Sequence, residues 1–177
     1  MKVLVITGSP HKNGTSAHLA EQFIKGAKEK GYEVIRFDAA EKQVHPCIAC
    51  ERCHNTDKGC VFKDAMEELN PELLSADVIA FVSPIYYYTI SAQIKAVIDR
   101  FYANDAALHN NKKAVLLLTM ADDTDESALG ALQTFKGICN FLEWKNAGTV
   151  IGLDCATVED LQKTDYLNKA YELGKSL

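Results

Sequence analysis

Short apolar runs alternate along the chain with longer segments in which apolar residues recur every three or four positions. The short runs predict buried parallel strands, which are continuously apolar, and the longer segments predict amphipathic helices. The predicted strands are residues 3–7, 33–37, 77–82, 113–119 and 147–151. The predicted helices run from about Ser16 to Gly31, over residues 64–74, 92–102 and 127–142, and from Val158 to the end.

Five repeats of strand and helix are typical of βαβ crossovers, which build a parallel sheet with helices on both faces. We therefore expect an α/β, flavodoxin-like three-layer sandwich with a five-stranded parallel sheet in the order 2-1-3-4-5. A length of 177 residues predicts one domain over residues 1–177. Ligands of such sheets bind beyond the carboxyl ends of the strands, where the strand order reverses, so the loops there are the ones to search.

Composition and charge narrow the function classes. There are 19 Lys and Arg against 24 Asp and Glu, a net charge of −5, which argues against nonspecific binding to nucleic acid. The N-terminal segment lacks the long apolar region of a signal peptide, and no apolar run approaches the roughly 20 residues of a membrane span. We expect a cytoplasmic protein without membrane contact, whose thiols stay reduced.

The loop after the first strand reads GSPHKNGTS (residues 8–16) and leads straight into a helix. A helix N-terminus attracts phosphate through free N–H groups and the positive end of its dipole. The spacing fits neither an ATP-type P-loop nor a dinucleotide fingerprint. Alternatively, Thr15 or Ser16 is only an N-cap and the rest a turn. The candidate hydrogen-bond donors are Ser9, Asn13, Thr15 and Ser16, with His11 and Lys12 adding charge.

Two further loops lie at the same predicted edge. The loop after the third strand carries Pro84, Ile85, Tyr86, Tyr87 and Tyr88, and three tyrosines with polar tips suit a flat heterocycle. Alternatively, they pack against neighbouring loops or a second subunit. The acidic loop over residues 119–125 argues against phosphate there, although Thr119 and backbone amides could reach the polar rim of a ring; alternatively it is a solvated turn.

Four cysteines occupy an irregular excursion at about residues 44–62, with the spacing Cys47-x2-Cys50-x2-Cys53-x6-Cys60. Bacterial ferredoxins space three cysteines in this way around an iron–sulfur cluster, with a shorter last gap and a following Pro. Two alternatives stay open. Zinc could bind the four thiolates, with His45 or His54 as spare donors, or the thiols could be free.

Several other conspicuous residues are expected to be structural. Cys139 and Cys155 are interpreted as small core residues, and Trp144 as a packing or interface residue. Asp99 and Arg100 are interpreted as a surface ion pair.

The GSPHKNGTS loop, the Cys-rich excursion and the segment SPIYYYTISAQIKAVIDRF together resemble the NAD(P)H-dependent FMN reductase-like branch of the flavodoxin-like proteins, with iron–sulfur flavoproteins the nearest group. The resemblance implies noncovalent FMN, with its phosphate at residues 9–16 and its ring between residues 84–88 and 119–122, Asp122 included. It also implies a [4Fe–4S] centre on the four cysteines and a homodimer or homotetramer. Family members usually carry Arg in place of His11 and Asn-Thr in place of Thr15-Ser16.

These observations together predict an FMN-dependent oxidoreductase that passes hydride or electrons from NAD(P)H to a flavin or another small acceptor. No side chain is needed as a general acid for hydride transfer. One alternative is an iron–sulfur flavoprotein or noncatalytic carrier that exchanges electrons with ferredoxin-like partners. Another is a metal-binding regulatory module built on the Cys-rich excursion.

Overall fold

A central sheet of five parallel strands and one short antiparallel strand organises the computed structural model, which describes residues 1–56 and 58–177. The parallel strands lie in the order β2-β1-β3-β5-β6, and β4 pairs with the end of β3. This confirms the parallel α/β architecture. The strands are β1 (Lys2–Thr7), β2 (Glu33–Asp38), β3 (Val78–Tyr86), β4 (Thr89–Ile90), β5 (Lys113–Thr119) and β6 (Lys145–Gly152).

The sixth strand, β4, corrects the prediction of a five-stranded sheet. β3 continues past its predicted end at residue 82 and folds back through Tyr87 and Tyr88, so that Ile85 pairs with Ile90. Both turn residues have positive φ, 45° and 67°. Tight hairpin turns with this geometry are usually built from Asn and Gly. Two tyrosines carry no such signal, so the sequence pattern did not reveal the hairpin.

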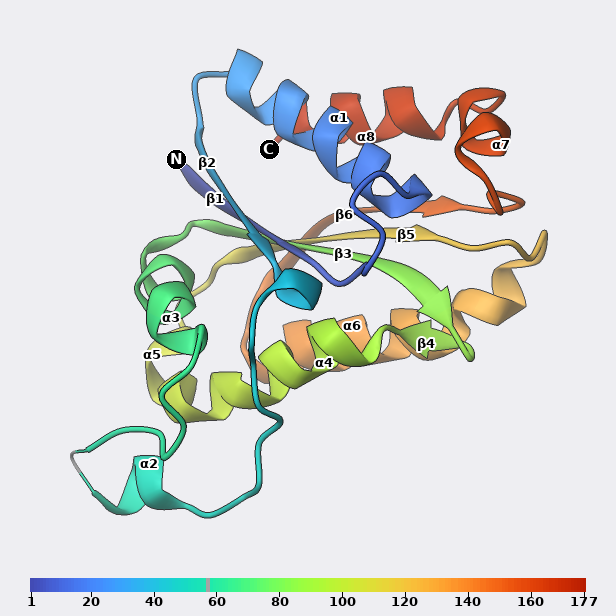
Figure 1. Ribbon diagram of the computed structural model, residues 1–177. Helices are drawn as coiled ribbons and strands as arrows, with labels where there is room; N and C mark the ends of the chain where they lie inside the picture. The colour runs from blue at the N-terminus through green and yellow to red at the C-terminus, as the bar shows by residue number, and fades with distance from the viewer. Residues whose placement is uncertain (57) are drawn as a thin grey trace.

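Helices cover both faces of the sheet (Figure 1). On one face lie α1 (Thr15–Glu29), α7 (Val158–Gln162) and α8 (Tyr166–Lys175). On the other lie α3 (Met66–Ser75), α4 (Ala92–Asp99), α5 (Asp105–Leu108) and α6 (Leu129–Phe141). The short α2 (Arg52–Asn55) lies in a loop that projects beyond the second face. The described residues also form the 3₁₀ turns η1 (Ala39–Glu41), η2 (Arg100–Asn104) and η3 (Asp125–Ala128).

The C-terminal segment forms two helices where the sequence pattern predicted one. Thr157 and Asp160 form a capping box that starts α7. The chain then turns, and α8 packs along α1 with its backbone very close. A Cβ atom on Gly26 of α1 would collide with the Tyr171 carbonyl, and one on Gly174 of α8 would meet the backbone of α1. The two glycines therefore set the separation of these helices.

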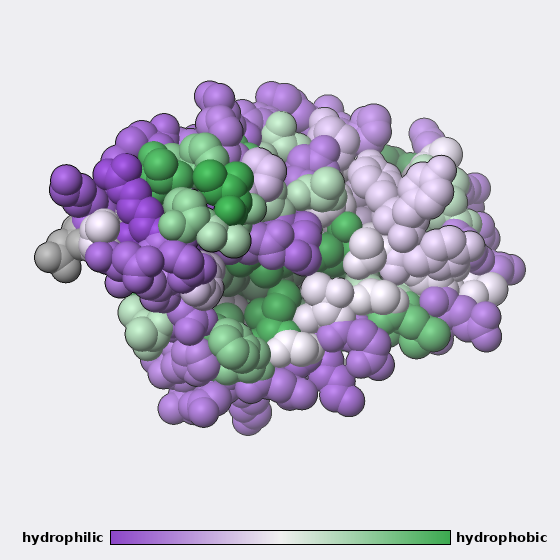
Figure 2. All heavy atoms as spheres, turned by 90° about the horizontal axis from the view of Figure 1, so that it is seen from below, coloured by the Kyte–Doolittle hydropathy of each residue, from purple (hydrophilic) through white to green (hydrophobic). Residues whose placement is uncertain are grey.

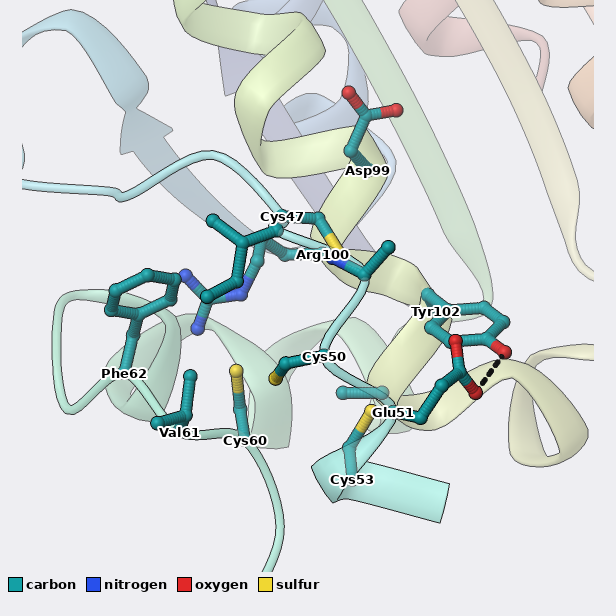
Figure 3. Close-up of a pocket in the computed structure, with 13 residues that line it drawn as sticks. Cys47, Cys50, Glu51, Cys53, Cys60, Val61, Phe62, Asp99, Arg100 and Tyr102 are labelled. Atoms are coloured by element: carbon teal, nitrogen blue, oxygen red, sulfur yellow. Dashed lines mark hydrogen bonds between the residues drawn. The ribbon is translucent and has the colours of Figure 1, made fainter. Parts of the chain in front are cut away.

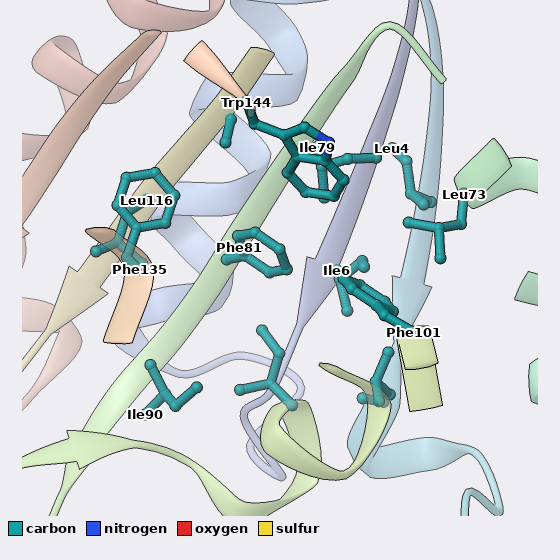
Figure 4. Close-up of a cluster of buried hydrophobic side chains, with 14 of the residues drawn as sticks. Leu4, Ile6, Leu73, Ile79, Phe81, Ile90, Phe101, Leu116, Phe135 and Trp144 are labelled. Atoms are coloured by element: carbon teal, nitrogen blue, oxygen red, sulfur yellow. The ribbon is translucent and has the colours of Figure 1, made fainter. Parts of the chain in front are cut away.

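Alternate strand residues build separate cores on the two faces of the sheet, because successive side chains of a strand point in opposite directions. Val3 and Val5 of β1 pack toward α1 and α8, whereas Leu4 and Ile6 pack toward α3 and α4. Phe81 anchors the second core (Figure 4) and is 2% exposed. Each such side chain contributes about 1.5–3 kcal/mol by burial, so the sheet is a rigid support for its edge loops.

The carboxyl ends of the parallel strands meet at one edge of the sheet. From β1 the chain crosses to β2 on one side and then to β3 on the other, which places the reversal of strand order between β1 and β3. The edge loops that the sequence singled out therefore converge. Within the described residues, no helix combines the length and apolar character needed to cross a membrane.

Candidate functional site

A cleft of about 780 Å³ opens at the carboxyl edge of the sheet, over the ends of β1, β3, β5 and β6. Most of the predicted cofactor-binding residues border this cleft. They are Ser9, His11, Asn13, Thr15, Ser16, Pro84, Ile85, Tyr86 and Thr119.

The start of α1 presents free backbone donors to the cleft. Gly14 is the N-cap, and within the described residues no side chain caps the helix, so the interpretation of Thr15 or Ser16 as a mere N-cap is wrong. The Gly14 N–H donates to the His11 carbonyl over 3.1 Å, and the His11 N–H donates to Ser9 Oγ over 3.1 Å. These bonds shape the loop and leave the first N–H groups of α1 for an anion.

Buried hydroxyls hold this loop against its neighbours. A Cβ on Gly8 would collide with the Ser91 hydroxyl, which instead donates to the Gly8 carbonyl over 2.7 Å. The Ser91 N–H in turn donates to Ser83 Oγ over 2.9 Å. Thr15 Oγ1 donates to Thr119 Oγ1 over 2.9 Å, which joins the start of α1 to the end of β5. The cleft walls are therefore tied together before any ligand binds.

Positive charge near the loop is modest. His11 and Lys12 are both exposed, and Lys12 Nζ lies 2.9 Å from a carboxylate oxygen of Glu41 in η1. Exposed pairs of this kind contribute little energy. The dipole and N–H groups of α1 are therefore the main attraction for a phosphate here.

The tyrosine-rich loop divides between two hollows. Three of its five predicted residues line the cleft, but Tyr87 and Tyr88 form the turn of the β3–β4 hairpin and line an adjoining hollow of about 290 Å³. Asp122 also lines this second hollow. Hydrogen bonds from the Ser127 hydroxyl and from the Thr124 N–H lower the pKa of its carboxyl group. Asp122 therefore lies outside the cleft that it was predicted to line.

The loop after β6 is the part of the cleft that the sequence analysis missed. Its residues carry no recognisable binding motif, but β6 is parallel to its neighbours, so its carboxyl end had to reach the same edge. The cleft residues that lie outside the predicted cofactor-binding segments are Cys155, Ala156, Thr157 and Val158.

The four cysteines of the excursion line one small hollow (Figure 3). Its other walls include Val61, Phe62, Arg100 and Tyr102. We call this space the cysteine hollow. Residue 57, within the predicted excursion of residues 44–62, lies outside the described residues. The cysteines are Cys47, Cys50, Cys53 and Cys60, and all four are free thiols.

The thiols of the cysteine hollow are close enough to interact electrostatically. Burial raises the pKa of Cys53, and the charges of Cys60, Cys47 and Cys50 raise it further. Among the described residues, no three His, Cys, Asp or Glu side chains converge closely enough to hold a single metal ion. The four cysteines thus line the same hollow, and their role as metal ligands stays a prediction.

A buried ion pair closes the base of the excursion. Arg100 Nη1 donates to the His45 carbonyl and to Asp64 Oδ2, each over 2.8 Å. The side chains of Arg100 and Asp64 are 3% and 1% exposed. Burial would raise the pKa of Asp64, but hydrogen bonds from Arg100, His45 and Met66 outweigh it and lower the pKa to about 2.

This ion pair corrects the interpretation of Asp99 and Arg100 as a surface pair. Asp99 pairs instead with Lys95, one helical turn earlier, over 2.6 Å. The chain passes from α4 into η2 at Arg100, which turns the guanidinium inward toward Asp64. Sequence spacing alone could not reveal a partner 36 positions away.

The remaining cysteines and Trp144 belong to the core, as predicted. Cys139 is 5% exposed and Cys155 2% exposed, and burial raises the pKa of both thiols. Trp144 is 5% exposed, and its indole N–H donates to the Leu108 carbonyl over 2.7 Å. Cys155 also borders the cleft, so it contacts both the core and the cleft.

Helix α4 connects the two candidate sites. Ser91, its N-cap, supports the cleft loop at Gly8, and Arg100, its C-cap, lines the cysteine hollow. At about 1.5 Å per residue, the rise from residue 91 to residue 100 is about 14 Å. Figure 1 shows the excursion around α2 at the opposite end of α4 from β4.

Comparison with known proteins agrees with this arrangement. Residues 1–152 match the family described as NADPH-dependent FMN reductase. The iron-sulfur flavoprotein MJ0731 of Methanocaldococcus jannaschii is 38% identical over 101 residues, which cover 56% of this chain and 50% of that protein. The chain spans about half the length of the curated iron–sulfur flavoproteins it matches.

Two solved structures share the fold at low sequence identity. The NAD(P)H:quinone oxidoreductase from Methanothermobacter marburgensis superposes with a TM-score of 0.75 at 18% identity, covering 99% of this chain and 94% of that one. An FMN-dependent NADH-azoreductase from Bacillus anthracis str. Ames Ancestor, in complex with FMN, gives 0.68 at 14% identity, covering 99% and 96%. Since the family match covers residues 1–152 and thus reaches from β1 through β6, the chain belongs to the NADPH-dependent FMN reductase family.

Proposed function

We propose that the protein is an FMN-dependent oxidoreductase that takes electrons from NAD(P)H and passes them to a small acceptor. The observation that carries this proposal is the cleft at the reversal of strand order, where α1 begins with no side-chain cap from any described residue. Its volume of about 780 Å³ lies within the range of pockets that enclose cofactor-sized ligands. When bound, FMN supplies a ring that accepts hydride or single electrons and releases them again.

One end of the cleft fits a phosphate. Ser9, Thr15 and Ser16 bring hydroxyls to the start of α1, and Asn13 brings an amide. His11 stands where family members usually carry Arg, so the permanent charge and the bidentate donors of a guanidinium are absent at this position. In this proposal the N–H groups of α1 and these side chains hold the phosphate, as helix N-termini commonly do.

The other end of the cleft fits a flat ring. Pro84, Ile85 and Tyr86 form one wall, and Thr119 with the backbone of residues 120–121 forms another. In the proposal these residues orient the ring and exclude water from one side. The adjoining hollow under Tyr87 and Tyr88 is the proposed entry for nicotinamide and acceptor, and no side chain is required as a proton donor.

A negative charge placed in the loop at residues 8–16 tests whether the cleft binds the FMN phosphate. Asn13→Asp changes one exposed amide into a carboxylate of the same size and leaves the fold intact. We expect at least a ten-fold weaker affinity for FMN, because a carboxylate repels the phosphate, and Ser16→Asp should abolish retention. The measurement is flavin absorbance and fluorescence titration of the apoprotein.

The matched control is Asn110→Asp, an exposed change in the loop between α5 and β5, which should leave the affinity for FMN unchanged. Equal affinity in the Asn13→Asp and Ser16→Asp variants and the native protein would remove the phosphate assignment. Steady-state oxidation of NAD(P)H with a quinone or flavin acceptor separates a reductase from a noncatalytic carrier, because a carrier does not turn over.

We further propose that the four cysteines hold a [4Fe–4S] cluster, which would exchange electrons with a ferredoxin-like partner. A zinc ion needs four ligands about 2.3 Å from a single point, whereas a cluster takes one thiolate at each of four iron corners. Four cysteines that line one hollow can supply one thiolate to each iron corner, which supports the cluster proposal.

Anaerobic reconstitution with iron and sulfide tests the cluster. We expect about four iron and four sulfide per chain, as a [4Fe–4S] centre requires, and loss of both in the Cys50→Ser variant. Cys139→Ala removes a buried thiol of the core and should keep full iron content, which makes it the control. Zinc without sulfide would support the zinc site instead, and neither metal would indicate free thiols.

Assembly and location are part of the same proposal. A groove of about 480 Å³ runs between the excursion, α4 and α6, and apolar residues gather in and around it (Figure 2). Phe141 and Leu129 on α6 are 64% and 51% exposed, and we propose that a homodimer or homotetramer covers them. The cysteines form no disulfide among the described residues, as is usual in a reducing compartment, so we propose a cytoplasmic location.

A further inference from the structure

Arg100 is a buried cation with more hydrogen-bonding capacity than its ion pair uses. Its two terminal nitrogens bind Asp64 and the His45 carbonyl. Its Nε–H is also buried, and it has no acceptor among the described residues. Buried polar groups without partners are rare, so an orphaned donor of this kind points to a group that the structure does not contain.

The orphaned donor belongs to a side chain that lines the cysteine hollow (Figure 3). The guanidinium also lies over the Phe62 ring, with 5.3 Å between its carbon and the ring centroid. Two acidic side chains share the wall, and each already has a polar partner. Glu51 accepts from the Tyr102 hydroxyl over 2.9 Å, and Asp99 pairs with Lys95.

Among the described residues that line this wall, Arg100 is therefore the cationic side chain, beside the thiols, the apolar groups and the already partnered Glu51 and Asp99. Four thiolates and an anionic inorganic core would concentrate negative charge in this space. A neighbouring guanidinium would offset that charge, and an N–H donor would bind sulfur. Hydrogen bonds to the sulfurs and nearby charge are established means of tuning a cluster.

We propose that Arg100 is a positioning residue for a thiolate-bound iron–sulfur group in the cysteine hollow. Its terminal nitrogens bind His45 and Asp64 at the base of the excursion, and its charge and unpartnered Nε–H belong to a side chain in the wall around the group. This inference rests on the proposed [4Fe–4S] site. Because reduction adds one negative charge, a fixed positive charge favours the reduced form and raises the reduction potential.

Substitution of Arg100 separates these two contributions. Arg100→Gln removes both the positive charge and the planar set of guanidinium N–H donors. Arg100→Lys keeps the positive charge but loses that set of donors. We expect Arg100→Gln to lower the ratio of reduced to oxidised cluster at a given potential about ten-fold, which is 59 mV for one electron. Arg100→Lys should restore most of the potential but still lose iron to a chelator faster than the native protein. The potential is measured by redox titration followed by electron paramagnetic resonance.

Two controls make the result specific. Arg52→Gln removes a positive charge from α2 of the same excursion but from a side chain outside the wall, so it should change neither potential nor retention. FMN content reports on folding, because the cleft lies at the other end of α4. If the Arg100→Gln variant does not fold, the reduction potential and the iron retention are measured on the Arg100→Lys variant.

The outcomes distinguish this inference from the proposed function. A native protein that takes up no iron refutes the cluster and this role of Arg100 with it. A loaded native protein and a loaded Arg100→Gln variant with equal potential and equal retention overturn the role of Arg100 alone. A variant that loses iron faster while its potential stays unchanged reduces Arg100 to a structural anchor and overturns the donor role.

Discussion

Tyr87 and Tyr88 occupy backbone conformations that tyrosine rarely adopts, with φ of 45° and 67°. For an L-residue this region costs about 1–2 kcal/mol. The Tyr87 side chain is 98% exposed, so packing does not offset the cost within the chain. A strained, exposed aromatic residue beside a cleft is typical of a functional surface.

Replacement of Tyr87 by Asn should stabilise the fold. Asn is favoured at the first central position of such turns, and little buried area is lost, so we expect the free energy of unfolding to rise by about 0.5–1 kcal/mol. Urea denaturation measures it. Tyr86→Asn is the control, since Tyr86 is only 41% exposed and does not have positive φ, and it should destabilise. A loss of stability in the Tyr87 variant would show that the ring packs in an assembly.

At the scale of elements, the close approach of α1 and α8 shows how small residues decide helix packing. Gly26 and Gly174 leave room for the backbone of the opposite helix. Because glycine has no Cβ atom, α8 can pack closely along α1 and join the core that contains Val3 and Val5 of β1. A methyl group at either position has to push the two backbones apart, because backbone atoms cannot move aside as a flexible side chain can.

Gly26→Ala should destabilise the protein although alanine favours helix. We expect a loss of about 1–3 kcal/mol from overpacking, seen as a lower thermal unfolding temperature and faster hydrogen exchange in α8. The matched control is Gly137→Ala on α6, where an added Cβ meets no atom within 4 Å. That variant should gain about 0.5–1 kcal/mol from helix propensity. Equal effects of the two changes would contradict the packing argument.

On the scale of the whole molecule, a rigid sheet carries two sites of different stability. The cleft rests on buried strands and on hydroxyls that join one loop to the next. The excursion projects beyond the helix layer, and its base depends on Asp64 and Arg100. Regions with few buried apolar contacts open at lower cost than the core, so the excursion should open first under stress.

Acid should release the excursion before it unfolds the sheet. The pKa of Asp64 is lowered from 3.8 to about 2, so its ionised form stabilises the folded state by about 2 kcal/mol above pH 4. That contribution disappears as the pH falls from about 4 to 2. We expect hydrogen exchange and proteolysis at residues 46–63 to increase in this range while far-ultraviolet circular dichroism stays constant. A fall of the circular dichroism signal over the same pH range in which exchange and proteolysis increase would contradict independent opening of the excursion.

Much of the fold and of the site followed from the sequence alone. Apolar runs and helical periodicity predicted five parallel strands and the helices on each face, because burial repeats with the period of each element. Topology then placed the loops after the first, third and fourth strands at one edge. The GSPHKNGTS loop and the cysteine spacing indicated chemistry because their residues are neighbours in the chain.

Only the tertiary structure decided features that depend on contacts between distant residues. It folded Tyr87 and Tyr88 into a hairpin turn, brought residues 155–158 to the cleft and moved Asp122 out of it. It also paired Arg100 with Asp64, 36 positions away, instead of its neighbour. The physical reason is the separation along the chain between the residues that interact. Periodicity and motifs record local preferences, whereas burial of a charge, a strained turn or a shared cleft is set by packing that no segment determines by itself.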